Sequence, residues 1–171
     1  MQLKVLTMDI KQALTTALDF EEKGHKIYEE TASKTKNPIV AKTFRYLADQ
    51  ELFHIEEIKE YLKKEKIELK GDKLKDTKNF FSITTTEFKQ KTKLSDDDVK
   101  AHETALELEQ KSYDFYKEQH GKTNNKDLKT FFNFLMKQEN AHYELIQKAY
   151  NFIKNPVAFY TEQEKWMADG G

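Results

Sequence analysis

The chain contains an internal repeat, and this repeat constrains the fold more than any other feature. Residues 13–66 align with residues 101–154 without a gap, and 19 of the 54 aligned positions are identical. Both copies contain Glu-x-x-His, as Glu51 and His54 in the first and as Glu139 and His142 in the second, an offset of 139 − 51 = 88 residues. A repeat unit that cannot bury its own apolar face packs on its copy, so we expect two similar helical hairpins around one core.

Apolar residues recur at helical spacing in both copies, and few residues interrupt the pattern. The 171 residues include only 5 Gly and 2 Pro, and 35% of them are charged, which favours long helices over sheets. The turn sequences KTKNP and GKTNN separate the helices of the two hairpins. In SDDD, residues 95–98, Ser95 is the predicted N-cap of the third helix. The spacing predicts four helices, over about residues 9–34, 38–66, 95–121 and 126–154.

A long connection, over about residues 67–94, joins the two predicted hairpins. It is too apolar for a free linker, because it contains Phe80, Phe81 and the β-branched run ITTTEF, so we expect it to cross the bundle and pack on it. One long crossover between two hairpins is the ferritin-like connection. The predicted fold is an all-α, ferritin-like four-helix bundle over residues 1–155. Residues 156–171 would form a short C-terminal helix and tail that packs through Phe159 and Trp166.

Composition excludes several kinds of site and partner. The absence of cysteine excludes disulfides, zinc–thiolate sites and iron–sulfur clusters within this chain. A net charge of −1 creates no global field that would recruit nucleic acid or an anionic membrane. No apolar run reaches the length of a signal peptide or a membrane span, so we expect a cytoplasmic protein without nucleic-acid or membrane partners.

Polar residues interrupt the inward stripe of all four predicted helices at one level. Each Glu-x-x-His pair lies in the centre of an otherwise apolar stripe, and the first and third helices each place one glutamate on their inward face. A charge in a core costs several kcal/mol or more unless something compensates it. The four glutamates and two histidines that should converge are Glu21, Glu51, His54, Glu109, Glu139 and His142.

Two divalent cations would compensate this layer, since they bring four positive charges to four carboxylates that would otherwise repel one another and bind protons. Carboxylates with imidazole nitrogens suit iron or manganese, and zinc could also bind. Di-iron carboxylate bundles have this ligand set: two helices each contribute one Glu, and the other two each contribute Glu-x-x-His. The sequence therefore predicts a di-metal site.

Three further residues lie near the predicted ligands. Tyr28 and Tyr116 follow Glu21 and Glu109 by seven residues, which places them on the same faces. They either fill the core or hydrogen-bond a ligand glutamate. His25, one turn after Glu21, is either an extra ligand or a packed side chain beside the site.

The twice-repeated order of Glu-x6-Tyr and Glu-x-x-His resembles the rubrerythrin-type di-iron domain of the ferritin-like superfamily, over about residues 8–155. The end EKWMADGG also looks like the ends of small rubrerythrin-like proteins. The resemblance implies two irons held by the six residues, with Glu51 and Glu139 bridging and with Tyr28 and Tyr116 bonded to ligand carboxylates. It implies that these tyrosines and the four glutamates serve the reduction of hydrogen peroxide (or dioxygen) at a diferrous site. It also implies a homodimer, sometimes formed by swapping hairpins.

Two departures from the family pattern bear on the predicted function. Rubrerythrins carry a rubredoxin domain that supplies electrons, and this cysteine-free chain holds none, so electrons would come from a separate donor protein. Rubrerythrins also carry an additional glutamate about one turn after the third-helix ligand, where this chain has Ser112 and Tyr113. That change moves the site toward a ferroxidase or oxidase, although His25 could partly replace the missing ligand. The alternatives are therefore a ferroxidase or iron-handling protein, a redox sensor, and a metal-free or zinc-filled interaction module.

Overall fold

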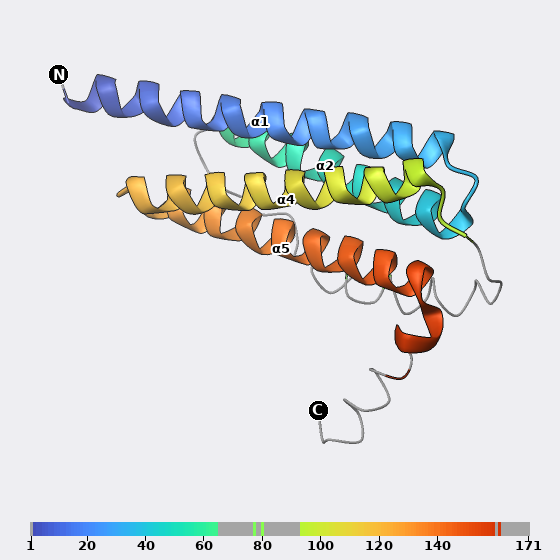
Figure 1. Cartoon of the computed structure of the whole chain (residues 1–171). Helices are drawn as coiled ribbons and strands as arrows, with labels where there is room; N and C mark the ends of the chain where they lie inside the picture. The colour runs from blue at the N-terminus through green and yellow to red at the C-terminus, as the bar shows by residue number, and fades with distance from the viewer. Residues whose placement is uncertain (1, 65–76, 78–79, 81–92, 160, 162–171) are drawn as a thin grey trace.

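The computed structural model describes residues 2–64, 77, 80, 93–159 and 161, with the backbone alone for residues 2–9. Its long helices are α1 (Gln2–Lys34), α2 (Pro38–Lys64), α4 (Asp96–Lys122) and α5 (Lys126–Lys154). They lie side by side as two antiparallel hairpins, α1 with α2 and α4 with α5 (Figure 1). Contacts of α1 with α4 and of α2 with α5 close the bundle. The predicted all-α, ferritin-like bundle is confirmed.

The two hairpin turns are built alike, as the repeat predicts. The side chain of Asn37 in one turn and of Asn125 in the other accepts hydrogen bonds from two backbone amides at the start of the next helix. The hydroxyl of a threonine two residues earlier, Thr35 or Thr123, accepts a hydrogen bond from the backbone amide of this asparagine. These bonds satisfy backbone amides that have no hydrogen-bond partner within the helix. The same threonine and asparagine therefore make the same hydrogen bonds in both turns.

A contact at the start of α4 ties the second hairpin to the first. Ser95 caps α4 through a reciprocal capping box with Asp98, which confirms the predicted N-cap. Thr35, in the turn between α1 and α2, donates a 2.5 Å hydrogen bond to Asp98 Oδ1. Hydrogen bonding by Thr35 and Ser95 outweighs burial and lowers the pKa of Asp98. The ionised carboxylate therefore links the first hairpin turn to the helix that begins the second copy.

Helices α2 and α4 run in the same direction (Figure 1), as a crossover connection between the two hairpins requires. Most of this connection lies outside the described residues, but two described positions bear on it. The Phe80 ring stacks on Tyr46 of α2 at a centroid distance of 4.2 Å, and Thr77 Oγ1 lies 2.9 Å from the Tyr46 hydroxyl. At these two positions the connection packs on the bundle, as predicted.

Helix α1 begins at Gln2 rather than near Asp9, and α2 is described as far as Lys64, so its predicted end near Lys66 lies outside the described residues. The early start has a simple reason, since residues 2–8 contain neither Pro nor Gly and nothing in them stops a helix. None of the helices in the described part of the chain is long and apolar enough to cross a membrane.

The predicted break at Pro156 is present. Helix α5 ends at Lys154, and residues 156–159 form a short helical segment that Asn155 begins by accepting a hydrogen bond from the Ala158 amide. Phe159 packs edge-on against Phe152 of α5, at a centroid distance of 5.5 Å. The predicted contact of Trp166 lies outside the described residues.

The apolar core has two clusters, one on each side of the polar layer along the helices. One cluster contains Phe44, Leu47 and Ile146, and the other contains Leu14 and Phe132. The polar layer therefore lies in the middle of the bundle, closed off from water at both ends.

Candidate metal centre

The structure brings all six predicted ligands together in the middle of the bundle. Helices α1 and α4 each contribute one glutamate, and α2 and α5 each contribute a glutamate and a histidine one turn apart. One ligand atom from each residue of the two Glu-x-x-His pairs can be chosen so that all four atoms lie within 4.8 Å of one another. All six side chains belong to residues that are at most 3% exposed: Glu21, Glu51, His54, Glu109, Glu139 and His142.

The Nδ1 atom of each histidine faces glutamates from other helices. His54 Nδ1 lies 3.0 Å from Glu21 Oε2 and 3.4 Å from Glu139 Oε1. The two imidazole rings are stacked, with centroids 5.3 Å apart and an interplanar angle of 17°. The corresponding distances from His142 Nδ1 are 3.1 Å to Glu51 Oε1 and 3.5 Å to Glu109 Oε2.

Several buried atoms of this cluster have no hydrogen-bond partner among the described residues. They include one oxygen each of Glu51, Glu109 and Glu139, and both ring nitrogens of His142. Nearly all buried polar atoms in proteins are paired, and an unpaired one costs about 1–3 kcal/mol. These carboxylate oxygens make no hydrogen bond but lie 3.1–3.5 Å from a histidine Nδ1, and both kinds of atom are metal ligands that converge on one small volume. The cluster therefore fits a pair of divalent cations.

The electrostatics of the cluster also call for added positive charge. Burial, together with the charges of Glu21 and its neighbouring glutamates, raises the pKa of both Glu51 and Glu139 well above the usual range. Burial alone would raise the pKa of Glu21 too, but attraction to His54 and hydrogen bonds from His54 and Tyr116 outweigh it and lower the pKa to about 2. Without cations, some of the carboxyl groups are therefore held in the protonated form.

Each tyrosine hydrogen-bonds a glutamate of the neighbouring helix, not the glutamate on its own helix. Tyr28 of α1 donates a 2.5 Å hydrogen bond to Glu109 of α4, and Tyr116 of α4 donates one to Glu21 of α1. Burial and the nearby carboxylates raise the pKa of both tyrosines above the usual value of 10.0, so they remain hydrogen donors. Each tyrosine orients one outer glutamate.

His25 does not join the cluster. Its Nδ1 lies 2.9 Å from the carbonyl oxygen of Ala48, and its Nε2 lies 3.8 Å from Glu29 on the partly exposed side of α1. Four residues after Glu21 the helix has turned by more than one full turn, which directs His25 toward the edge of α2. The structure thus gives no support to His25 as an extra ligand or as a replacement for the additional rubrerythrin glutamate.

The positions one turn after the outer glutamates are both small and buried. Ser112 is 3% exposed and stands where the additional rubrerythrin glutamate would be. Its counterpart in the first copy, at 112 − 88 = 24, is Gly24. An ideal Cβ on Gly24 would lie 3.4 Å from Glu51 Oε2. Sequence reasoning missed Gly24, although a glycine inside a helical pattern is a recognisable signal.

A bundle with two repeated hairpins around a buried layer of four glutamates and two histidines belongs to the class of ferritin-like di-metal carboxylate proteins. Comparison with known families narrows this class, because residues 12–150 match the family described as Rubrerythrin, a span that includes all six cluster residues. The chain therefore belongs to the rubrerythrin family, as the sequence resemblance predicts. Comparisons with curated proteins and with solved structures give no match.

Proposed function

We propose that this chain is a non-haem di-iron oxidoreductase that reduces hydrogen peroxide to water, with electrons from a separate donor protein. The observation that carries the proposal is the buried group of converging, unpaired carboxylate and imidazole atoms. Two ferrous ions bound there would supply one electron each to the O–O bond. Hydrogen peroxide then takes up two electrons and two protons and yields two water molecules.

The two Glu-x-x-His pairs would form the centre of the site. Glu51 and Glu139 would bridge the two ions, since they come from neighbouring helices α2 and α5 and each keeps an unpaired oxygen. His54 and His142 would each bind one ion through Nδ1, the nitrogen that faces the carboxylates. Imidazole and carboxylate ligands of this kind suit iron.

The outer glutamates would cap the two ends of the site. Tyr28 fixes one oxygen of Glu109 and leaves its Oε2 without a hydrogen bond, whereas Glu21 accepts a hydrogen bond from Tyr116 at Oε1 and lies 3.0 Å from His54 Nδ1 at Oε2. Because the layer lies between two apolar clusters, water is excluded and electrostatic interactions are stronger than in solvent. These residues position the carboxylates before the oxidant arrives.

Iron oxidation is the second candidate function, and Ser112 is the observation that favours it. A site without the additional glutamate has a symmetric ligand set, which moves it toward the ferroxidase or oxidase type. Iron storage also needs a protein cage, whereas the proposed peroxidase would be a homodimer, with or without exchange of hairpins between its two bundles. Sedimentation of the full chain distinguishes these, since a dimer supports the peroxidase and a large shell supports iron storage.

The direct test is stopped-flow absorbance of the anaerobically prepared diferrous protein mixed with peroxide or with dioxygen. Faster oxidation by peroxide supports the proposal, and faster oxidation by dioxygen supports an oxidase or ferroxidase. A variant with both Glu51→Ala and Glu139→Ala is the control, and it should neither bind two irons nor react. Metal analysis of protein purified without chelator addresses the remaining alternative, because a metal-free or zinc-filled chain would indicate an interaction module.

A further inference from the structure

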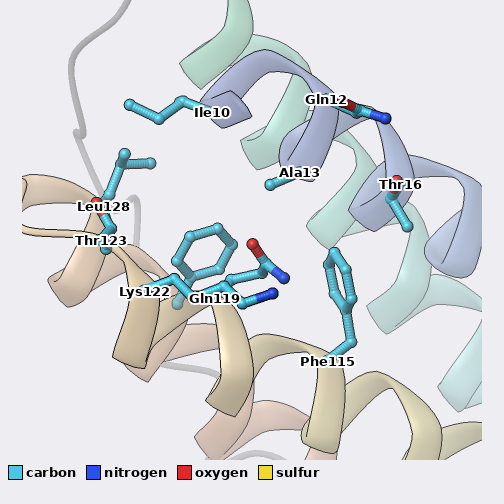
Figure 2. Close-up of a pocket in the computed structure, with 10 residues that line it drawn as sticks. Ile10, Gln12, Ala13, Thr16, Phe115, Gln119, Lys122, Thr123 and Leu128 are labelled. Carbon is cyan, nitrogen blue, oxygen red and sulfur yellow. The ribbon is translucent and has the colours of Figure 1, made fainter. Parts of the chain in front are cut away.

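A cavity of about 430 Å³ lies between the first half of α1 and the end of α4 (Figure 2), and none of the six cluster residues lines it. We call it the first cavity. Its volume is within the range of small-molecule sites, which in helical bundles lie between the helices. Its apolar lining residues are Ile10, Ala13, Phe115, Leu128 and Phe132. Among its described polar lining residues Lys122 is the only charged one.

The repeat produces a counterpart, the second cavity, of about 590 Å³ at the opposite end of the bundle. Five lining positions of the two cavities correspond at the offset of 88 residues. In the first cavity they are Ile10, Ala13, Gln119, Lys122 and Thr123, and in the second Asp98, Ala101, Thr31, Lys34 and Thr35. The cavities therefore share a place in the architecture, and the side chains make the difference between them.

The second cavity is polar and is crossed by a hydrogen bond, whereas the first is neither. Thr35 donates a 2.5 Å hydrogen bond to Asp98, which joins α4 to the turn after α1. Ala101 is the one apolar residue among the described residues that line the second cavity. In the first cavity Ile10 replaces Asp98 and makes no such bond, and Phe115 adds an aromatic ring. An open apolar cavity with aromatic walls is typical of a ligand site.

The aromatic wall of the first cavity connects it to the metal centre. The rings of Phe115 and Phe132 both lie against Tyr116, at centroid distances of 5.7 and 6.2 Å. Tyr116 donates a hydrogen bond to Glu21 of the cluster. Electrons tunnel faster through closely packed atoms than across a gap. A molecule in the first cavity therefore has a continuous packed route to the metal ligands.

Lys122 gives the first cavity a preference for an anionic group. Its side chain is exposed and pairs with Glu118 one turn earlier on the same helix. Exposed ion pairs of this kind contribute at most about 1 kcal/mol, so Lys122 loses little when it turns to a phosphate. Aromatic walls and one cation fit a planar ring system that carries an anionic group.

We propose that the first cavity binds a planar aromatic reductant with an anionic group, of the reduced flavin mononucleotide class, which passes electrons to the metal pair. Its ring system lies against Phe115 and Phe132, and its phosphate lies near Lys122. The inference rests on the proposed function and adds to it a small-molecule reductant, beside any donor protein.

The reaction balances with this reductant. A reduced flavin gives up two N–H bonds and so releases two electrons and two protons. The two ferric ions take one electron each and become ferrous. Hydrogen peroxide then takes up two electrons and the two protons, its O–O bond breaks, and two water molecules form. One reductant molecule thus supplies all the electrons and protons that one peroxide molecule consumes.

Binding is measured on the metal-free chain, by the quenching of the fluorescence of flavin mononucleotide as protein is added. The parent should saturate with a Kd of about 100 µM or lower, and Ala13→Leu, which fills the cavity, should weaken binding about tenfold, equivalent to about 1.4 kcal/mol. Ala101→Leu is the matched control, because it makes the same change at the equivalent position of the second cavity. No saturation up to about 1 mM, or equal affinity of the Ala13→Leu and Ala101→Leu variants, would overturn the inference.

A second pair of variants tests the anionic group and decides the matter if Ala13→Leu does not fold. Lys122→Gln should weaken the binding of flavin mononucleotide about threefold to fivefold, the effect of one exposed charge. It should leave the binding of riboflavin, which has no phosphate, unchanged. Lys34→Gln is the control at the equivalent position of the second cavity. An equal loss for both flavins, or for both lysine variants, would show that Lys122 does not bind the phosphate and would refute the proposed site.

Electron transfer is tested by mixing reduced flavin mononucleotide anaerobically with the diferric protein. Loss of the ferric absorbance should be about tenfold slower in Ala13→Leu than in Ala101→Leu. Flavin binding without this difference would overturn the role of the cavity in electron transfer. If the flavin binds and reduces the iron but peroxide is not reduced, the proposed function is wrong and the cavity remains a reductant site. If peroxide is reduced with a protein donor and no flavin binds, the proposed function stands and the inference is wrong.

Discussion

The two copies of the hairpin are identical in their metal layer and differ in the layers beside it. Every glutamate and histidine of the cluster in residues 13–66 has its equivalent in residues 101–154, and Tyr28 has its equivalent in Tyr116. In the neighbouring layer the first copy has Leu14 and Leu62 where the second has His102 and Tyr150, at the same offset of 88. Loss of one charged residue from a buried layer leaves the charges of the others uncompensated, so the whole set is needed. An apolar layer tolerates substitutions that keep its total volume.

His102 shows how far the flanking layer can vary. It is fully buried, its Nδ1 lies 2.7 Å from the carbonyl oxygen of Asp98, and its ring packs against Phe44 and Tyr150. Its Nε2 has no hydrogen-bond partner among the described residues. The second copy thus tolerates a buried imidazole where the first has the apolar side chain of Leu14.

The largest expected effect comes from removing either of the two glutamates that we propose to bridge the ions, one in each copy. Glu51→Ala and Glu139→Ala should each weaken iron binding by more than about 100-fold, since even residues that only support a metal ligand contribute about 10–100-fold. Equilibrium dialysis with ferrous iron under anaerobic conditions measures this effect. The account requires the two variants to be similar, and full iron binding by one of them would break the equivalence of the copies.

The next effect is the pH dependence of stability. In the metal-free protein the raised pKa values of Glu51 and Glu139 lie above 4.5, so the folded state holds more protons than the unfolded chain and stability falls as pH rises above about 4.5. Glu21 acts in the opposite sense, because its pKa in the folded protein is lowered to about 2. Its ionised carboxylate stabilises the folded state above pH 4.5, and this stabilisation is lost as pH falls from 4.5 toward 2.

Bound iron should reverse the first of these trends, since metal ligands must be deprotonated and iron therefore binds more tightly as pH rises. Thermal unfolding between pH 4.5 and 8, with and without anaerobic ferrous iron, tests this prediction. The increase in melting temperature on iron loading should be larger at pH 8 than at pH 5. An increase that is the same at both values would argue against ionised carboxylates as the ligands.

A moderate and equal effect is expected for the two tyrosines. Tyr28→Phe and Tyr116→Phe each remove one hydrogen bond to an outer glutamate, and each should weaken iron binding by about tenfold, the lower end of the range for groups that support a ligand. Calorimetric titration with ferrous iron compares the variants. A strong effect for one tyrosine and none for the other would show that the two metal positions differ more than the repeat suggests.

The smallest effect tests the difference between the copies. His102→Leu gives the second copy the residue type of the first and removes an unpaired buried nitrogen, so it should stabilise the protein by about 1 kcal/mol. Burial lowers the pKa of His102, so the parent loses stability as pH falls below 6.5, and the variant should lose less over this interval. Chemical unfolding of the parent and the variant at pH 7.5 and 5.5 measures both the gain in stability and its dependence on pH. A variant less stable than the parent would indicate that His102 has a role beyond packing.

The sequence predicted the helices and the cluster because both depend on local spacing and on the repeat. It predicted α5 over residues 126–154 as observed, since Asn125 caps one end and Asn155-Pro156 closes the other. It also placed both Glu-x-x-His pairs on the inward stripe, because residues three apart on a helix share a face.

The sequence did not predict features that depend on how helices meet. It placed Tyr28 on the same face as Glu21, but the antiparallel packing of α1 and α4 puts its hydroxyl on Glu109. It left the orientation of His25 open, which depends on the Ala48 carbonyl of the neighbouring helix. It gave no reason for Gly24, because the atoms that a side chain would touch belong to Glu51 on α2.

The most direct test of the central claim is an anaerobic titration of the metal-free chain with ferrous iron, followed by a spectroscopy that distinguishes coupled from isolated ions. The account predicts an end point of two irons per chain, held as a magnetically coupled pair. An end point of one iron, two uncoupled ions, or no binding would contradict a di-metal site formed by both copies of the repeat.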